Sequence, residues 1–263
     1  MARFLIEYYS NALRRTTSFY AVIPNDPRRE IPWEKNQFSG QSLKALFLLH
    51  GYTGRSECWI PQEMLEKYHL AVFSPTAENS FYTDGEAVGR QYETMVALEL
   101  VDYVRATFHL ALKPEETFIA GMSMGGYGSL HLALAHPDRF SKAGCMSSAL
   151  IVPRVSQMKP GENDGLANYA YYRDCFGDPL SEAIKREVNP EVQVKKLKDA
   201  GVKVPDLYLC CGTEDFLIEP NRDFHRFLED EGVSHVYVEE PGQHDMVFWL
   251  GSIERILAWM TRA

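Results

Sequence analysis

One stretch of the sequence carries a recognisable chemical arrangement: residues 121–125 read Gly-Met-Ser-Met-Gly, with Ser123 at the centre. The stretch follows the apolar run 117–120 and precedes the helix-like segment 128–135, so the pattern predicts strand, sharp turn and helix. Such a turn holds its serine in a sparsely populated backbone conformation, and only small residues fit two positions before and after it. We therefore expect an exposed, nucleophilic hydroxyl at a helix N-terminus, where developing negative charge is stabilised.

A serine hydroxyl is a weak nucleophile until a base takes its proton, and an acid usually orients that base. The acid is expected after a later strand. The sequence Gly-Thr-Glu-Asp-Phe at 212–216 follows the apolar run 207–211 and meets this requirement. Asp215 is the predicted acid. Its neighbour Glu214 is the alternative, although a solvated loop charge is the simpler interpretation of that residue.

The base is expected near the C-terminus, after the last strand. His244, in the sequence Pro-Gly-Gln-His at 241–244, follows the β-like run 236–240. An imidazole can both accept and return a proton near neutral pH. Of the other histidines, His50 is expected to hold the shape of the loop in which it lies. Asp245, next to His244, is expected to begin a helix rather than to act as the triad acid.

Acyl chemistry at Ser123 also needs two backbone N–H groups that point at the developing oxyanion. Met124, which follows the nucleophile, is predicted to supply one of them. The loop 50–54, His-Gly-Tyr-Thr-Gly, is the predicted source of the second, and a simple β-turn is the alternative interpretation. Its glycines allow the main chain to approach a substrate closely.

The elements that must position these residues alternate between apolar runs and helical periodicity, which predicts an α/β fold with a mostly parallel sheet flanked by helices. The first two predicted strands form an antiparallel pair at the sheet edge. Strands are expected at 3–10, 17–23, 43–49, 70–74, 117–120, 140–146, 205–211 and 233–239. Helices are expected at 60–68, 88–108, from Ser123 to His136, at 220–231 and at 245–261.

A chain of 263 residues is compatible with one large domain over 1–263. Two stretches interrupt the alternation. Residues 25–42 are rich in Pro, Arg, Asn and Gly and are predicted to form a loop. Residues 149–190 combine Pro and Gly with a cluster of aromatic residues. We predict that 149–190 is an insertion of short helices that caps the site, with a long surface excursion as the alternative.

Composition restricts the partners. A net charge of −9 without a basic stripe argues against nucleic acid. The N-terminal residues become polar too soon for a signal peptide, and no apolar run approaches the roughly 20 residues that span a bilayer. Five cysteines without C-x-x-C spacing are expected to be reduced thiols of a cytoplasmic protein. No metal-ligand spacing and no phosphate-binding loop is present, so no metal and no other cofactor is implied; a homo-oligomer stays open.

With these residues placed, the chain resembles the esterase D family of α/β-hydrolases, and within it most of all the bacterial tributyrin esterases. The matching stretches run in order through most of the chain, at 48–54, 58–59, 81–84, 121–128, 211–217 and 241–244. The resemblance implies an α/β-hydrolase fold, a catalytic triad of Ser123, Asp215 and His244, and the Tyr52 N–H as the second oxyanion donor.

The predicted function is that of a serine carboxylesterase, which hydrolyses short-chain acyl esters of small molecules through an acyl-enzyme. Four aromatic residues are candidates for the substrate pocket, with the core as their alternative position: Trp59, Phe81, Tyr82 and Tyr127. Three alternatives use the same chemistry: an S-formylglutathione hydrolase, a carbohydrate acetyl or feruloyl esterase, and a mycolyl-type acyltransferase. An alternative of a different class is a hydrolase-fold binding protein without catalysis.

Overall fold

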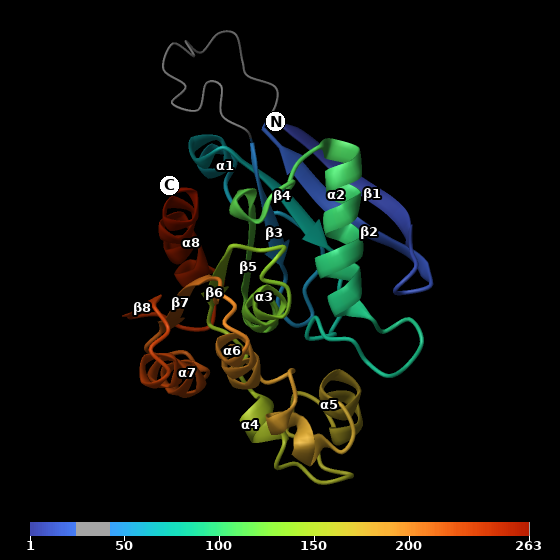
Figure 1. The fold of residues 1–263 in the computed structure, drawn as a ribbon, viewed down its shortest axis with the longest axis vertical. Helices are drawn as coiled ribbons and strands as arrows, with labels where there is room; N and C mark the ends of the chain where they lie inside the picture. Colours follow the sequence, from blue (N-terminus) through green and yellow to red (C-terminus); the bar gives the residue numbers. More distant parts are fainter. Residues whose placement is uncertain (25–42, 263) are drawn as a thin grey trace.

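The computed structural model describes residues 1–24 and 43–262, and within them eight strands form one sheet in the order β1-β2-β4-β3-β5-β6-β7-β8 (Figure 1). The strands are β1 (Ala2–Ser10), β2 (Arg15–Ile23), β3 (Lys44–Leu49), β4 (Leu70–Pro75), β5 (Thr117–Met122), β6 (Lys142–Met146), β7 (Asp206–Gly212) and β8 (His235–Glu240). β2 pairs antiparallel with β1 and β4, and the other neighbours are parallel. This is the predicted α/β fold with its antiparallel edge; the loop predicted at 25–42 lies outside the described residues.

The central strands consist of unbroken apolar runs because both of their faces are covered. Every residue of β4 and β5 is buried, whereas the edge strand β8 is half-buried along its whole length. Side chains alternate between two hydrophobic cores: Phe47 of β3 packs into one core, and its neighbours Leu46 and Leu48 pack into the other.

Each core lies beneath its own set of helices. The helices are α1 (Gln62–Tyr68), α2 (Val101–Phe108), α3 (Met124–Ala135), α6 (Pro190–Asp199), α7 (Ile218–Asp230) and α8 (Met246–Thr261). Val104 of α2 and Leu130 of α3 belong to the core on one face, and Leu65 of α1 and Ile253 of α8 belong to the core on the other. In the part of the chain that the structure describes, no helix combines the length and the apolar character needed to cross a membrane.

The prediction of a helix at 88–108 is wrong at its start, and the observed helix is irregular in its first half. Residues 94–100 form a π-helical segment, η1 (Thr94–Leu100), which continues into α2. Val88 is exposed and precedes the helix, because the Gly85 N–H donates to Arg90 O and closes a turn there. Helical spacing alone gave no sign of this turn.

The segment 149–190 folds into short elements between β6 and β7: α4 (Val152–Val155), α5 (Tyr169–Phe176) and the 3-10 helix η3 (Leu180–Lys185). α4 and α5 lie together at one end of the molecule (Figure 1). The segment leads into α6, a helix that the sequence analysis did not predict. Its start signal was present, however, since Asn189 caps the Glu191 N–H and Pro190 occupies the first turn.

Candidate active site

Ser123 occupies the sharp turn between β5 and α3, with φ 57° and ψ −120°. Positive φ is strained for a residue with a Cβ, and neighbouring packing must hold it. A Cβ on Gly121 would clash with Gly125 O, and a Cβ on Gly125 would clash with Leu49 O. The two glycines therefore let β3, β5 and α3 pack closely enough to fix the turn, as the pattern predicted.

The side chains of Ser123, Asp215 and His244 meet in one hydrogen-bonded line. The Ser123 hydroxyl donates to His244 Nε2, with 2.9 Å between the two atoms. On the other side of the ring, His244 Nδ1 donates to the Asp215 carboxylate, at 2.8 Å from Oδ2 and 3.0 Å from Oδ1. The three residues come from the loops after β5, β7 and β8, whose carboxyl ends meet at one edge of the sheet.

Asp215 is buried, and its burial by itself would raise the pKa of the carboxyl. Hydrogen bonds from His244 and from the Leu217 N–H, with a smaller contribution from the nearby Ser147 side chain, outweigh that effect and lower the pKa below its usual value. The carboxylate is therefore ionised at neutral pH and can orient the imidazole and stabilise an imidazolium.

The two neighbouring acids, Glu214 and Asp245, form hydrogen bonds with backbone groups and not with His244. Glu214 is exposed; its carboxylate accepts the Gly242 N–H at 2.6 Å and the Thr213 hydroxyl at 2.8 Å, so it ties the loop after β7 to the loop after β8. Asp245 caps α8 by accepting the N–H groups of Val247 and Phe248. Of the three acids considered from the sequence, Asp215 is the one in contact with the imidazole.

Two aromatic rings flank the imidazole of His244. The ring of Phe216 lies 4.5 Å from it, centroid to centroid, and is 74% exposed at the mouth of the site. The indole of Trp249 meets it edge-on, at 5.0 Å and an interplanar angle of 86°. Phe216 and Trp249 confine the orientation of the ring, although neither had been singled out from the sequence.

The loop after β3 lies beside the serine. A Cβ added to Gly51 would stand 3.6 Å from Ser123 Cβ, and the Gly54 N–H donates to Gly51 O to close a turn. His50 Nδ1 donates to Gly51 O, and His50 Nε2 accepts the Ala77 N–H. Burial lowers the pKa of His50, so its neutral ring holds the loop in shape, as expected from the sequence.

The N–H groups of Tyr52 and Met124 remain available for a ligand. Met124 is the first residue of α3, and the first N–H groups of a helix have no partner within that helix. In the described residues, the neighbouring Thr53 N–H donates to Asn79 Oδ1, whereas no protein acceptor is found for the Tyr52 N–H. The loop after β3 thus forms a turn and still offers one free donor, the Tyr52 N–H, while the start of α3 offers the second, the Met124 N–H.

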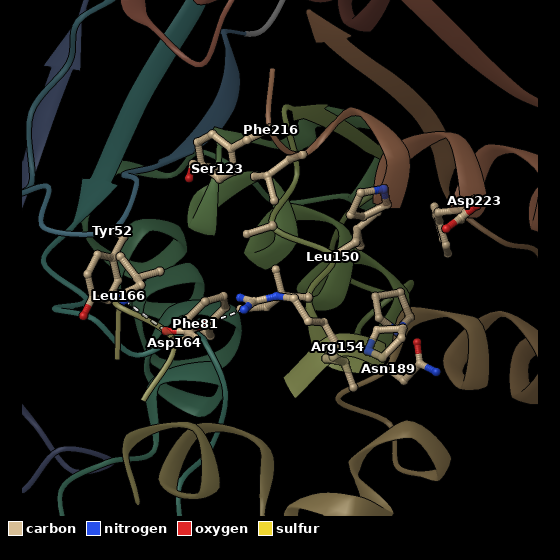
Figure 2. A pocket seen from close by; sticks show the side chains of 18 of the residues that line it. Tyr52, Phe81, Ser123, Leu150, Arg154, Asp164, Leu166, Asn189, Phe216 and Asp223 are labelled. Atoms are coloured by element: carbon tan, nitrogen blue, oxygen red, sulfur yellow. Dashed lines mark hydrogen bonds and ion pairs between the residues drawn. The ribbon is translucent and has the colours of Figure 1, made fainter. Parts of the chain in front are cut away.

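Ser123 and His244 open into a pocket of about 880 Å³. The segment 149–190 forms a large part of its lining through residues of α4 and of the loops around it. Figure 2 shows Arg154 reaching across the pocket to Asp164, with a 2.6 Å ion pair between them, and Asn189 and Asp223 on the far side. A pocket of this size can enclose a small ligand almost completely.

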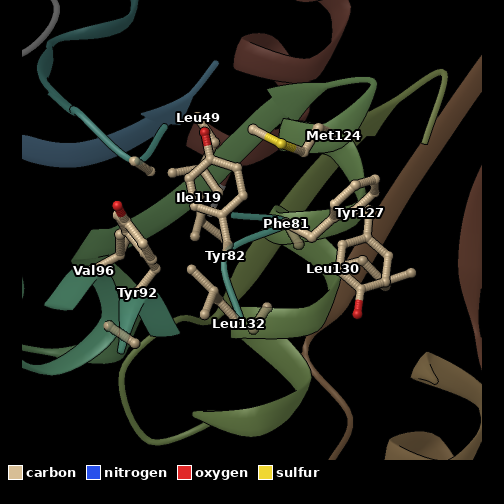
Figure 3. Close-up of a cluster of buried hydrophobic side chains, with 14 of the residues drawn as sticks. Leu49, Phe81, Tyr82, Tyr92, Val96, Ile119, Met124, Tyr127, Leu130 and Leu132 are labelled. Atoms are coloured by element: carbon tan, nitrogen blue, oxygen red, sulfur yellow. The ribbon is translucent and has the colours of Figure 1, made fainter. Parts of the chain in front are cut away.

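Of the four aromatic residues proposed for the pocket, Phe81 lines it and three do not. Tyr82 and Tyr127 are completely buried under the turn (Figure 3), where their hydroxyls donate to His50 O and Val188 O. Trp59 packs into the core on the opposite face of the sheet. The hydroxyl contacts of Tyr82 and Tyr127 hold these two rings behind the site, and none of the three rings lines the cavity.

Sequence reasoning missed most of the pocket lining. Residues such as Leu150, Leu166, Asn189 and Phe224 carry no motif, and only the folded path of the segment brings them to the cavity. The position of Phe216 beside Asp215 was the one available signal. In the described residues, His, Cys, Asp and Glu side chains form no group of three that could hold a metal ion.

Comparisons with known proteins agree with this geometry. The Esterase family model matches residues 30–260. An acetyl esterase of Caldicellulosiruptor saccharolyticus is 37% identical, and the match covers 100% of this chain and 99% of that protein. Two solved structures from Staphylococcus aureus are each 27% identical: fluorophosphonate-binding serine hydrolase F (TM-score 0.82, covering 100% of this chain and 99% of that one) and an S-formylglutathione hydrolase (TM-score 0.81, covering 99% of each).

Proposed function

Because the chain belongs to the Esterase family and is a serine esterase of the α/β-hydrolase fold, we propose that Ser123, His244 and Asp215 are its catalytic triad and that short-chain acyl esters are its substrates. The observation that supports this most strongly is the continuous line from the Ser123 hydroxyl through both nitrogens of His244 to Asp215. A full-length relative that is an acetyl esterase supports the short acyl group.

The reaction follows from these contacts. Ser123 Oγ attacks the ester carbonyl while His244 Nε2 takes its proton. The oxyanion forms between the N–H groups of Tyr52 and Met124, whose free donors support this role. His244 then returns the proton to the leaving alcohol, which departs and leaves the acyl group on Ser123. A water molecule, deprotonated by His244, attacks the acyl-enzyme; as the second tetrahedral intermediate collapses, His244 returns this proton to Ser123 Oγ and the acid is released.

The charges of the pocket favour neutral esters over the S-formylglutathione alternative. Among the described lining residues, Arg154 is the one cationic side chain, and it is already paired with Asp164. Two further carboxylates, Glu191 and Asp223, line the opposite side. The carboxylates of a glutathione moiety would meet these acids without an unpaired cation to bind them.

The segment 149–190 is proposed to act as the cap of a single domain, because its residues form much of the pocket lining. We also propose a cytoplasmic location. All five cysteines are free thiols, which fits a reducing compartment.

Replacement of the nucleophile tests the mechanism. We expect Ser123→Ala to lower kcat for p-nitrophenyl acetate by about 10⁴–10⁶-fold, as in other serine triads, because no other hydroxyl can form the acyl-enzyme. The circular dichroism spectrum and melting temperature should stay close to those of the wild type. Near-normal turnover by this variant would overturn the assignment of Ser123.

A substrate panel tests the substrate class. It comprises p-nitrophenyl esters from acetate to laurate, S-formylglutathione and acetylated xylan. We expect the highest kcat/KM at about two to four acyl carbons, in line with the acetyl esterase relative, and little activity on S-formylglutathione, whose carboxylates would meet the acidic lining, or on acetylated xylan. A preference for S-formylglutathione would contradict the charge argument, and a preference for laurate would contradict the short acyl group.

A further inference from the structure

An ion pair in the proposed substrate pocket has no part in the chemistry above. Arg154, in α4, forms it with Asp164, in the loop that precedes α5, with 2.6 Å between Nη1 and Oδ2 (Figure 2). Both residues line the same cavity as Ser123 and His244. An ester that binds in this cavity therefore shares it with two opposite charges.

The carboxylate of Asp164 is held firmly by the fold. Its Oδ1 accepts the N–H groups of Leu166 and Ala167, at 3.0 and 2.9 Å. Its Oδ2 accepts the hydroxyl of Tyr172 at 2.9 Å in addition to the guanidinium, and Tyr172 is itself completely buried. The Asp164 side chain is only 14% exposed. Three of its four donors do not involve Arg154, so the carboxylate would keep its place in the cavity wall without that residue.

The guanidinium of Arg154 has fewer contacts. Its side chain is 54% exposed, and within the described residues its one hydrogen-bond acceptor is Asp164. An arginine keeps its charge at every pH at which a protein is assayed. Arg154 is also the one Lys or Arg among the described residues that line the cavity. Asp164 therefore neutralises the permanent positive charge that this lining would otherwise offer to a ligand.

Protonation does not release this pair near neutral pH. Partial burial by itself would raise the pKa of the Asp164 carboxyl, but hydrogen bonds from the Ala167 N–H, from Arg154 and from Tyr172 lower the pKa to about 2. The carboxylate is therefore ionised over the whole range in which an esterase is assayed. A carboxylate on a substrate would have to compete with Asp164 for the guanidinium.

We propose that Asp164 determines the charge specificity of the pocket: by pairing with Arg154, it keeps the site from binding esters that carry a carboxylate. Glu191 and Asp223 also line the cavity and add negative charge, but Asp164 is the acid in contact with the cation. Once Asp164 loses its charge, the guanidinium becomes a binding group for an anionic ester. This inference rests on the esterase function proposed above.

The test compares two pairs of esters whose members differ in charge but hardly in shape. In one pair the charge lies on the alcohol: 4-acetoxybenzoate and 4-acetoxybenzamide. In the other it lies on the acyl group: the mono-p-nitrophenyl ester of adipic acid and the p-nitrophenyl ester of its monoamide. The measured quantity is the kcat/KM of the anionic ester divided by that of its neutral partner. This charge ratio is compared between variants, so differences in intrinsic reactivity cancel.

We expect Asp164→Asn to raise the charge ratio by about 5-fold in at least one pair, the scale of one partly exposed ion pair. Asparagine keeps the size of the side chain and an oxygen for the Leu166 and Ala167 N–H groups, but it leaves the guanidinium unpaired. The gain should vanish when Arg154→Gln is added to Asp164→Asn. It should also shrink in about 0.5 M salt, since dissolved ions screen exposed charges.

Glu182→Gln is the matched control, because it removes one carboxylate from an exposed ion pair with Lys185, and neither residue belongs to the described pocket lining. Its charge ratio should equal that of the wild type. An unchanged ratio in Asp164→Asn would overturn the proposal. A gain that persists in the double variant would also overturn it, because net charge alone would then explain the effect.

A second variant covers the case in which Asp164→Asn does not fold. Arg154→Gln, at an exposed position, should lower the charge ratio by about 3-fold, because it leaves the Asp164 carboxylate unpaired in the cavity. An unchanged ratio there would overturn the proposal as well. Failure of the esterase function is distinguishable, because the wild type would then leave all four esters intact or Ser123→Ala would still hydrolyse them.

Discussion

The position of a carboxylate within one turn decides whether it can reach the imidazole. Glu214 and Asp215 are adjacent, yet Glu214 is exposed and tied to the Gly242 N–H, whereas Asp215 is buried against His244. Side chains of consecutive residues in a turn point in different directions, so a longer arm gives Glu214 no advantage. Which of the two acids serves the site therefore depends on the direction of its side chain, and the residue types alone do not determine that direction.

At this scale the matched pair Asp215→Asn and Glu214→Gln separates the two acids. We expect Asp215→Asn to lower kcat by about 10⁴-fold, since the amide favours the wrong imidazole tautomer and cannot stabilise the imidazolium. Glu214→Gln should lower kcat by less than about 10-fold, because it loses only a loop contact of an exposed side chain. The rates are measured with p-nitrophenyl acetate near neutral pH. A larger loss in Glu214→Gln than in Asp215→Asn would identify the wrong acid.

Among the helices and strands, α3 is one of the elements whose side chains have the least free space around them. All of its residues except the last are buried, because it lies between the sheet and the segment that follows β6. A Cβ on Gly128 would clash with the ring of Tyr82, which is itself completely buried. The first turns of the helix contain Gly125, Gly126 and Gly128 because neighbouring backbone and side chains fill the space that a larger side chain would need. Gly251 in α8 is different: it is exposed, and a Cβ there would meet no atom within 4 Å.

These two glycines predict opposite effects of the same substitution. Gly251→Ala should stabilise the fold by about 0.5–1 kcal/mol, since alanine loses less backbone entropy in a helix. Gly128→Ala should destabilise it by about 1–3 kcal/mol through overpacking against Tyr82. Urea unfolding followed by circular dichroism measures both values. A stabilising Gly128→Ala would show that the ring can move aside at little cost.

For the whole molecule, a half-buried carboxylate connects two parts of the fold. The Glu93 carboxylate, just before η1, accepts hydrogen bonds from His131 Nε2 at 2.8 Å and from His136 Nε2 at 3.0 Å, at the far end of α3. Burial would raise the pKa of Glu93, but the bonds from the two histidines lower it well below its usual range. The native state thus favours the ionised carboxylate more than the unfolded chain does.

A depressed carboxyl pKa sets the pH range in which this contact stabilises the fold. Its contribution is complete above the unfolded pKa of Glu93, about 4.3, and is lost as the pH falls from there toward the folded pKa. We expect Glu93→Gln to lower the free energy of unfolding by about 1–3 kcal/mol at pH 7, and the difference from the wild type to shrink below pH 4. Urea titrations at several pH values measure it, with the exposed Glu86→Gln as a control. A difference that does not change with pH would mean that the charge of Glu93 contributes nothing.

The sequence by itself determined the order of the strands along the chain and the residue types of the site. Continuous apolar runs mark the buried strands, and the glycines around Ser123 mark the turn, because both patterns follow from contacts within a few residues. The start of η1 was missed because the turn at 85–90 leaves no trace in the apolar spacing. α6 was missed although its cap residues Asn189 and Pro190 were legible.

The tertiary structure alone decided which side chains meet. It turned Tyr82, Tyr127 and Trp59 away from the cavity, formed much of its wall from the segment 149–190, and brought Phe216 and Trp249 beside His244. These outcomes depend on side-chain direction and on the packing of residues far apart in the chain. Local sequence encodes periodicity and turns, but it does not encode which distant surfaces come into contact, since that depends on the packing of the whole fold.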